Sequence, residues 1–192
     1  MHQAKELHRR SIRIAGADYT EPVAYFLTIC AADRGNIFGR IEDGRAVLSA
    51  LGETVRACWV QIPDHFAAAT IKEFVVMPNH FHGIVALGVS GRYQAALGVG
   101  ARYIVPSDTT ARTPERFQKP VKGSIPTIVR TFKAAVTRDA RKNLRFGSGR
   151  IWQSNYFEHV LRDDEEYAKA TRYILENPAR WQWDQENLER KD

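Results

Sequence analysis

The sequence predicts an α+β fold, namely a ferredoxin-like split βαβ core with helices on one face of an antiparallel sheet and an additional C-terminal helix. Four apolar segments have the length and the residue types of strands. Two segments between them carry apolar residues at helical spacing, which gives the order β-α-β-β-α-β. The second face of such a sheet is expected to stay open and to be free to carry a site.

The N-terminal half of this core begins with a strand at residues 23–30, where VAYFLTIC is rich in aromatic and β-branched residues. A small hairpin is expected next, with its turn at Asp43 and Gly44. Ser49 has the residue type of an N-cap, and the apolar residues after it recur at spacings of three and four. We therefore expect a helix that starts at Ser49 and ends before Pro63.

The remaining helices and strands are predicted in the same way, from apolar strand-like segments and from apolar residues at helical spacing. Residues 70–87 are expected to form two apolar strands joined by a short turn, and residues 124–143 an amphipathic helix. A short strand is expected at residues 156–161. Residues 163–177 have the pattern of a final helix, which opens with a D-x-x-E variant of the capping box and stops before a proline.

The whole chain, residues 1–192, is expected to be one domain of 21.8 kDa. Between about 88 and 123 the composition changes to Gly, Ser, Thr, Pro and Arg without a sustained period, which predicts a flexible inserted loop. The residues from about 182 onward read as a polar tail.

Composition also bears on the compartment. The first residues are polar and basic, and no apolar run approaches the roughly 18 residues of a membrane span. Cys30 and Cys58 form no CxxC pair and no disulfide framework. We therefore expect a cytoplasmic protein that does not interact with a membrane.

Positive charge is concentrated in one part of the chain. Residues 111–150 contain eleven basic and two acidic residues, a net charge of +9, whereas the whole chain is +6. This segment predicts a surface for a polyanion. A solvated helix face next to a charged linker is the alternative.

His80 and His82 form an H-x-H pair within an expected strand. Alternate side chains of a strand share a face, so both imidazoles point the same way and Phe81 points into the opposite layer. Two neutral imidazoles on one strand make half of a site for a divalent metal. Two unrelated surface histidines are the alternative.

Tyr173 and Asn177 are four residues apart on the last expected helix, which places them on one helical face. A phenol is a poor nucleophile at neutral pH, but it can lose its proton beside a divalent cation that also holds a phosphodiester. The Asn177 amide could supply an oxygen ligand to that cation. A core tyrosine and an asparagine that caps the helix end are the alternatives.

These motifs together resemble a known family. MPNHFHGIV resembles the histidine–hydrophobic–histidine motif of the HUH nucleases. IWQSNYFEHVLRDDEEYAKATRYILENPARW is similar to the catalytic end of the single-tyrosine HUH transposases, in particular the REP-associated tyrosine transposases, and RRSIR at 9–13 and AYFLTIC at 24–30 resemble their N-terminal pattern. The resemblance covers roughly residues 9–87 and 124–181.

The resemblance implies roles for single residues. Tyr173 matches the nucleophile, and His80, His82 and Asn177 match the ligands of a divalent cation, Mg²⁺ or Mn²⁺. Asparagine is one methylene shorter than the glutamine of many relatives, so the helix must approach more closely or a water must bridge. Tyr156 and Tyr167 compete as nucleophiles. Glu158 and His159 are candidates to support a metal ligand by a hydrogen bond, but they are on opposite faces of their strand, so at most one faces the metal, and a structural polar pair is the alternative.

The implied activity is cleavage and rejoining of single-stranded DNA by transesterification through a 5′-phosphotyrosine, without a nucleotide cofactor. Its substrates would be hairpins of palindromic repeats, and the protein would act as a monomer or a homodimer. Basic side chains of the predicted helix at 124–143 are candidates to hold phosphates: Arg130, Lys133, Arg138, Arg141 and Lys142.

Two other classes of function remain open. A non-catalytic regulator derived from a transposase would bind hairpins without forming a covalent adduct. A zinc hydrolase would use His80, His82 and a third imidazole such as His159, with an open position for water. Loss of Tyr173 would not affect such a hydrolase.

Overall fold

A four-stranded antiparallel sheet forms the centre of the protein. The computed structural model describes residues 24–88, 121 and 123–187. The sheet contains β1 (Ala24–Cys30), β4 (Ala69–Val76), β5 (His80–Leu87) and β6 (Phe157–Leu161) in the spatial order β4-β5-β1-β6. Every neighbouring pair is antiparallel, and β1 and β5 are the two central strands. This is the predicted split βαβ topology, and the fold class is confirmed.

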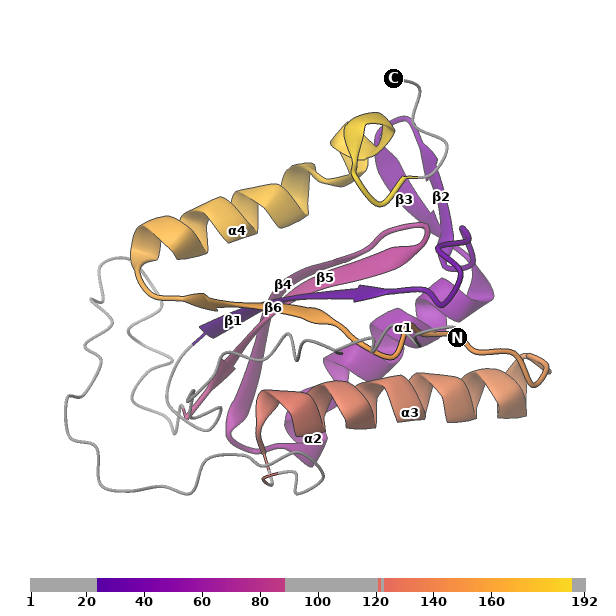
Figure 1. Ribbon diagram of the computed structural model, residues 1–192, viewed down its shortest axis with the longest axis horizontal. Coiled ribbons are helices and arrows are strands. Elements are labelled where there is room, and N and C mark those ends of the chain that lie inside the picture. Colours follow the sequence, from indigo (N-terminus) through magenta and orange to yellow (C-terminus); the bar gives the residue numbers. More distant parts are fainter. Residues whose placement is uncertain (1–23, 89–120, 122, 188–192) are drawn as a thin grey trace, which may run out of the picture.

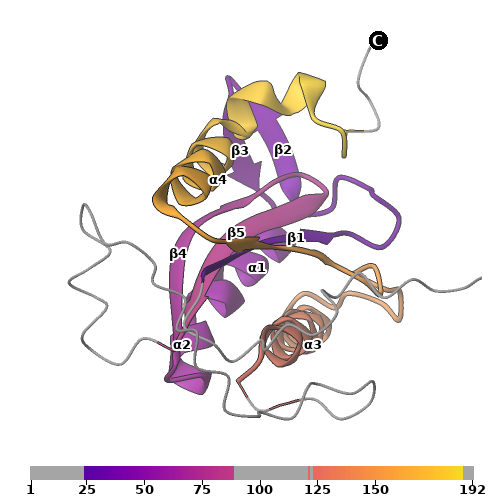
Figure 2. The same cartoon turned by 60° about the vertical axis from the view of Figure 1, so that its left-hand side comes forward.

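The helices lie on both faces of this sheet. α1 (Ala50–Val60) and α3 (Ile125–Asn143) cover one face, and α4 (Asp164–Glu176) crosses the other, as Figures 1 and 2 show from two directions. A short α2 (Ile62–His65) follows α1, and a 3-10 helix, η1 (Pro178–Trp183), continues from α4. The face that we expected to be open is thus covered by the C-terminal helix. Among the described residues, no helix is long and apolar enough to cross a membrane.

The larger hydrophobic core lies between the sheet and the α1–α3 layer. Trp59 of α1 and Phe81 of β5 pack with ring centroids 4.6 Å apart, and Phe132 of α3 lies 5.5 Å from Phe81. All three side chains are fully or almost fully buried. Phe81 points into this layer because side chains alternate along β5, so its neighbours His80 and His82 face α4.

A smaller apolar cluster lies under α4. It contains Ile84 of β5, Leu161 of β6 and Ile174 of α4, with Phe26 of β1 packed against it. Of the residues in α4, Ile174 is the one that is buried. The remaining area of this face is available for polar and aromatic side chains, and there the candidate site lies.

The local signals of the sequence are confirmed at the connections. The hairpin of β2 (Gly39–Glu42) and β3 (Arg45–Leu48) turns at Asp43 and Gly44, whose φ angles of 48° and 71° are those of a left-handed turn. Ser49 caps α1, because its Oγ accepts a hydrogen bond from the Gly52 N–H at 3.1 Å. The two cysteines are free.

The cap of α4 differs in one detail from the predicted capping box. The Asp163 carboxylate accepts a hydrogen bond from the Glu166 N–H at 2.8 Å, as expected. The reciprocal bond goes one residue further back, because the Glu166 carboxylate accepts from the Arg162 N–H at 2.9 Å. The expected inserted loop at 88–123 and RRSIR at 9–13 lie almost wholly outside the described residues, as does the end of the polar tail.

Candidate metal and nucleophile site

His80 and His82 lie side by side on the α4 face of β5, as the H-x-H spacing predicts. Their ring centroids are 4.4 Å apart, with an angle of 68° between the ring planes. Both side chains are buried, with 0% and 3% of their surface exposed. They are therefore not surface histidines, which excludes the alternative reading of this motif.

Hydrogen bonds orient both rings through Nδ1. Asn79 uses its amide NH₂ to donate to the carbonyls of Arg34 and Glu186, so its Oδ1 accepts from Nδ1 of His80 at 2.9 Å. The His82 Nδ1 lies 2.9 Å from the hydroxyl oxygen of Thr28. Within the described part of the chain, Nε2 of each ring is buried without a hydrogen-bond partner. Such orphaned nitrogens are what a metal ligand needs.

Burial keeps both imidazoles neutral. It lowers the pKa of His80 to about 4, although nearby Asp184 acts in the opposite direction. The pKa of His82 is also lowered well below its ordinary value, by burial first and by the neighbouring His80 second. At neutral pH the nitrogens that carry no proton can donate their lone pairs to a cation.

Asp184 brings a carboxylate to the two histidines, and sequence reasoning missed it. Its Oδ2 lies 4.0 Å from Nε2 of His80, and its side chain is 5% exposed. The three residues offer ligand atoms that all lie within 4.8 Å of one another. The other oxygen, Oδ1, accepts from the Glu186 N–H at 2.7 Å, which holds the carboxylate in place. Two imidazoles and a carboxylate form a donor set that fits a divalent cation.

Tyr173 and Asn177 extend the site along α4. The Tyr173 ring lies 5.1 Å from the His82 ring and 5.9 Å from the Phe26 ring, and 45% of the residue is exposed. Burial and Asp184 raise the pKa of Tyr173, whereas a hydrogen bond from the Asn177 side chain lowers it. Asn177 is buried, and among the described residues its Oδ1 has no partner. It is thus a further oxygen donor beside the tyrosine.

A cleft of about 850 Å³ opens at this site. Thr28 and His82 from the sheet, Tyr173 and Asn177 from α4, and Asp184 after η1 line it. The cleft is thus lined by the Tyr173 phenol, the His82 imidazole, the Asn177 amide and the Asp184 carboxylate. Chemically, the arrangement can hold a cation and present a hydroxyl to a ligand bound at that cation.

Comparison with known proteins places the chain among relatives. No family model matches the sequence. An uncharacterized protein of Haemophilus influenzae is 39% identical over 180 residues, which span 93% of this chain and 92% of that protein. The chain belongs to the same family as this protein.

Two further comparisons confirm the resemblance to the REP-associated tyrosine transposases. A putative REP-associated tyrosine transposase of Haemophilus influenzae is 22% identical over 163 residues, 85% of this chain and 74% of that protein. The solved structure of a REP-associated tyrosine transposase bound to a REP hairpin superposes with a TM-score of 0.55 and 18% identity, over 88% of this chain and 73% of that one. The fold of this family member is therefore a transposase fold.

Three other candidate residues of this family member lie away from the two histidines, namely Tyr156, Tyr167 and Glu158. Tyr167 donates a hydrogen bond to the Glu73 carboxylate at 2.8 Å, beside the small cluster under α4. Glu158 lies on the opposite face of the sheet, where it accepts from the Tyr156 hydroxyl at 2.7 Å. Glu158 is therefore not placed to support a metal ligand, and its candidacy for that role is wrong.

His159 lies on the α4 face of the sheet, as His80 and His82 do, but on β6 and not next to them on β5. It lies opposite Phe26, whereas His82 lies opposite Thr28 on the other side of β1, so a whole strand separates the two imidazoles. Its Nε2 lies 3.5 Å from the Glu166 carboxylate instead. His159 thus neither supports His82 nor completes the three-histidine site of the zinc hydrolase.

The basic residues of α3 divide into two groups. Lys133 is turned inward, and its ammonium donates to the carbonyls of Gln153 and Asn155, each at 2.9 Å. The prediction that Lys133 is free to contact phosphates is therefore wrong. The other four basic residues are exposed on α3, which lies across the sheet from α4 and the candidate metal ligands (Figure 1): Arg130, Arg138, Arg141 and Lys142.

Proposed function

We propose that this protein is a metal-dependent single-stranded DNA endonuclease and transposase, which binds hairpin DNA and cleaves and rejoins it. One observation carries the proposal: two buried imidazole nitrogens without partners lie beside a carboxylate, and the half-exposed Tyr173 phenol is next to them. A pure binding module has no need of this costly arrangement, because each buried polar atom without a partner destabilises the fold.

Hairpin DNA is the proposed substrate. A solved structure of the same fold is that of a REP-associated tyrosine transposase bound to a REP hairpin, which supports this class of ligand. The exposed cations of α3 supply a surface for the phosphates of a stem. Since they lie across the sheet from the histidines, the stem would extend around the β6 edge while a flanking single strand enters the cleft.

The cation would be held by His80, His82 and Asp184, with the Asn177 Oδ1 as a further donor. Mg²⁺ and Mn²⁺ are the proposed ions. A divalent cation bound there would polarise the scissile phosphate and stabilise its developing negative charge. The protein's own contribution is to keep both imidazoles neutral and to fix their orientation through Asn79 and Thr28.

Tyr173 is the proposed nucleophile. Its phenol oxygen forms a bond to phosphorus while the bond from phosphorus to the 3′ oxygen breaks, which leaves a free 3′-hydroxyl and a 5′-phosphotyrosine. The phenol releases its proton to solvent, and the 3′ oxygen takes one up. Asn177 stabilises the tyrosinate, because its hydrogen bond lowers the pKa of Tyr173 against the effect of burial. A second 3′-hydroxyl can reverse the step, so rejoining needs no nucleotide cofactor.

The same proposal covers the organisation of the chain. One catalytic domain would span residues 1–192, with the 88–123 segment inserted in it, and it would act on chromosomal DNA in the bacterial cytoplasm. Monomeric and homodimeric forms are both compatible with a site whose described residues all come from one chain.

The test is covalent capture of labelled DNA. Wild-type protein with Mn²⁺ and a hairpin that carries a 3′-labelled single strand should retain the label through denaturing electrophoresis, whereas a 5′ label should be released. Tyr173→Phe should bind the hairpin normally and form no adduct. Tyr167→Phe is the matched control, because that phenol is on the same helix but bonds to Glu73.

Two outcomes would contradict the proposal. If no variant forms an adduct while hairpins still bind, the protein is a non-catalytic regulator. If Tyr173→Phe still forms the adduct and Tyr167→Phe does not, the nucleophile lies on another face of α4.

A further inference from the structure

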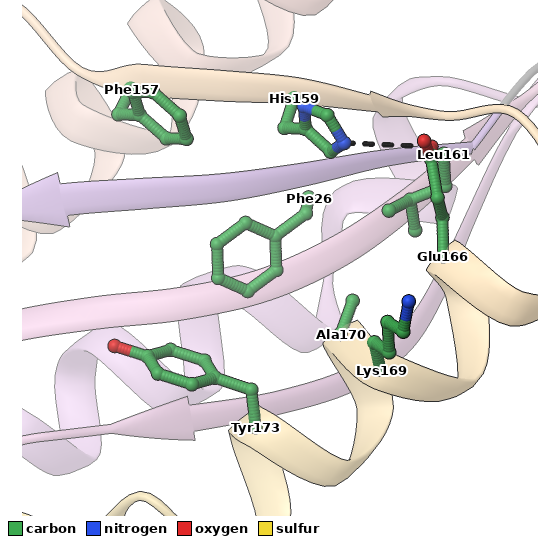
Figure 3. A pocket seen from close by; sticks show the side chains of 8 residues that line it. All are labelled: Phe26, Phe157, His159, Leu161, Glu166, Lys169, Ala170 and Tyr173. Atoms are coloured by element: carbon green, nitrogen blue, oxygen red, sulfur yellow. Dashed lines mark ion pairs between the residues drawn. The ribbon is translucent and has the colours of Figure 1, made fainter.

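A second pocket lies next to the catalytic cleft, between β6 and α4, and the proposed function does not use it. Its volume is about 450 Å³. Figure 3 shows side chains from β1, β6 and α4 that converge on it. The walls are apolar or aromatic, formed by Phe26, Phe157, Leu161, Ala170 and Tyr173.

The rim of this pocket is polar. His159, Glu166 and Lys169 line it, and the His159 imidazole lies 3.5 Å from the Glu166 carboxylate, which Figure 3 marks by a dashed line. Lys169 is a further cation at the same edge, paired on its outer side with Glu165. A ligand with a flat apolar face and a hydrogen-bonding edge matches this combination of walls and rim.

The pocket borders the cleft that is lined by His82, Asn177 and Asp184. Phe26, Phe157 and Tyr173 line both. The Tyr173 ring forms part of the wall between them, and its hydroxyl points away from Ala170 and Lys169 in Figure 3. A ligand in the pocket would thus lie directly beside any group that the Tyr173 hydroxyl attacks.

Phe157 is the feature of this pocket that packing alone does not explain. It is 51% exposed although it lies on the α4 face of the sheet, opposite Thr28. An exposed phenylalanine at the junction of two pockets loses hydrophobic stabilisation that a buried position would provide. In proteins that bind single-stranded nucleic acid, exposed aromatic side chains serve as platforms on which bases stack.

We propose that this pocket, bounded by Phe26, Phe157, Leu161, Ala170 and Tyr173, holds one unpaired nucleobase of a nucleotide that flanks the scissile phosphate. This inference rests on the proposed function and adds a base-binding subsite to it. The base would stack on Phe157, and its edge would meet His159 and Glu166 at the rim. The subsite would position the strand so that its phosphate lies at the Tyr173 hydroxyl.

Binding of single-stranded DNA tests the subsite without cleavage. The probe is a hairpin with a single-stranded flank, measured by fluorescence anisotropy in the Tyr173→Phe background, which keeps the ring. Phe157→Ala should weaken binding about 5- to 150-fold, the range expected for one stacked base. Phe157→Tyr should retain the affinity. Leu175→Ala is the control, because Leu175 is 68% exposed and lies on α4 outside the residues that line the pocket.

Two further measurements separate stacking from a general effect on the fold. Ala170→Leu should weaken binding by filling the pocket, although no aromatic ring is lost. Replacing single bases of the flank with abasic sites should identify one position whose loss weakens binding to wild type as much as Phe157→Ala does. At that position the losses of affinity caused by the abasic site and by Phe157→Ala should not be additive, because each change removes the same contact.

The outcomes for the subsite and for catalysis are distinct. Unchanged affinity of Phe157→Ala and Ala170→Leu would overturn the subsite, even if wild type forms the adduct. An equal loss with a hairpin that lacks the flank would also overturn it. Base-dependent binding with no adduct from wild type would support the subsite and reject cleavage by Tyr173.

Discussion

Thr28 on β1 lies directly opposite His82 on β5, and its hydroxyl oxygen is 2.9 Å from Nδ1 of the imidazole. This contact fixes the ring so that the second nitrogen, Nε2, is left for another partner. When the hydroxyl oxygen accepts the Nδ1 proton, the lone pair of Nε2, which is buried and unpaired within the described residues, is left available to a cation. Groups that orient a metal-binding histidine in this way set its affinity.

Removing this hydroxyl should weaken metal binding although no ligand is lost. Thr28→Val keeps the shape of the side chain, and we expect Mn²⁺ affinity to fall about 10- to 100-fold, as for other residues that orient ligands. Thr28→Ser should stay near wild type. Isothermal titration with Mn²⁺ measures both, and equal affinities of wild type and Thr28→Val would show that the hydroxyl plays no part.

Lys133 should matter for stability and not for DNA. Its ammonium donates to three consecutive carbonyls, those of residues 153–155. Lys133→Met should therefore lower the free energy of unfolding by about 1–3 kcal/mol, because these acceptors lose their donor. The slope of log affinity against log salt for hairpin binding should not change.

The exposed basic residues of α3 should behave in the opposite way to Lys133, with an effect on DNA binding and little effect on stability. Arg130→Gln and Arg141→Gln should each reduce the salt slope by about 1 and leave the unfolding free energy within about 0.5 kcal/mol. Urea unfolding and hairpin titrations at several salt concentrations give both quantities. A reduced slope in Lys133→Met, with the two arginine variants unchanged, would place the phosphates at the other edge of α3.

The sequence predicted those features that depend on local periodicity. Alternation along residues 80–82 placed both histidines on one face and Phe81 on the other, as the structure has them. The spacing of four residues placed Tyr173 and Asn177 together at the C-terminal end of α4, and both line the same cleft. Turn and cap residues fixed the ends of β3, α1 and α4 with similar success.

The features that were missed depend on contacts between distant segments. Asp184 lies in an irregular turn after η1, where no period shows which way a carboxylate points, and only packing against β5 brings it to His80. Lys133 lies off the apolar stripe of α3, yet its long side chain reaches back to the loop before β6. Neither contact leaves a local signal.

Gly83, directly after the H-x-H motif, should not tolerate a side chain. A Cβ at this position would lie 2.7 Å from Cζ of Phe81 and 2.8 Å from Cζ2 of Trp59, both in the packed core. Gly83→Ala should therefore destabilise the protein by about 1–3 kcal/mol, as overpacking does. Gly147→Ala is the control, because no atom lies within 4 Å of its added Cβ.

Urea unfolding of the two variants gives the comparison. Gly147→Ala should change the unfolding free energy by about 0.5 kcal/mol or less. If Gly83→Ala changes the free energy of unfolding no more than Gly147→Ala does, Trp59 and Phe81 can move apart at no cost. The orientation of β5 would then not depend on this packing.

Asp184 and Asn177 should separate into a metal ligand and a residue that acts on Tyr173. A carboxylate is charged and binds a divalent cation more strongly than an amide oxygen does, and Asp184 is the residue grouped with both histidines. Asn177 instead lowers the pKa of Tyr173 through its hydrogen bond. Asp184→Asn should therefore impair metal binding, whereas Asn177→Ala should mainly slow adduct formation.

Thermal unfolding with and without Mn²⁺ measures the first effect. A cation at about 100 times its Kd stabilises the native state by about 2.7 kcal/mol. In a protein of 192 residues this raises Tm by roughly 5–10 °C. Asp184→Asn should lose most of this rise, and His80→Ala and His82→Ala should lose all of it. Asn177→Ala should keep most of the rise while its adduct forms at least tenfold more slowly. A normal rise in Asp184→Asn together with none in Asn177→Ala would exchange the two roles, because the amide would then be the ligand that the cation requires.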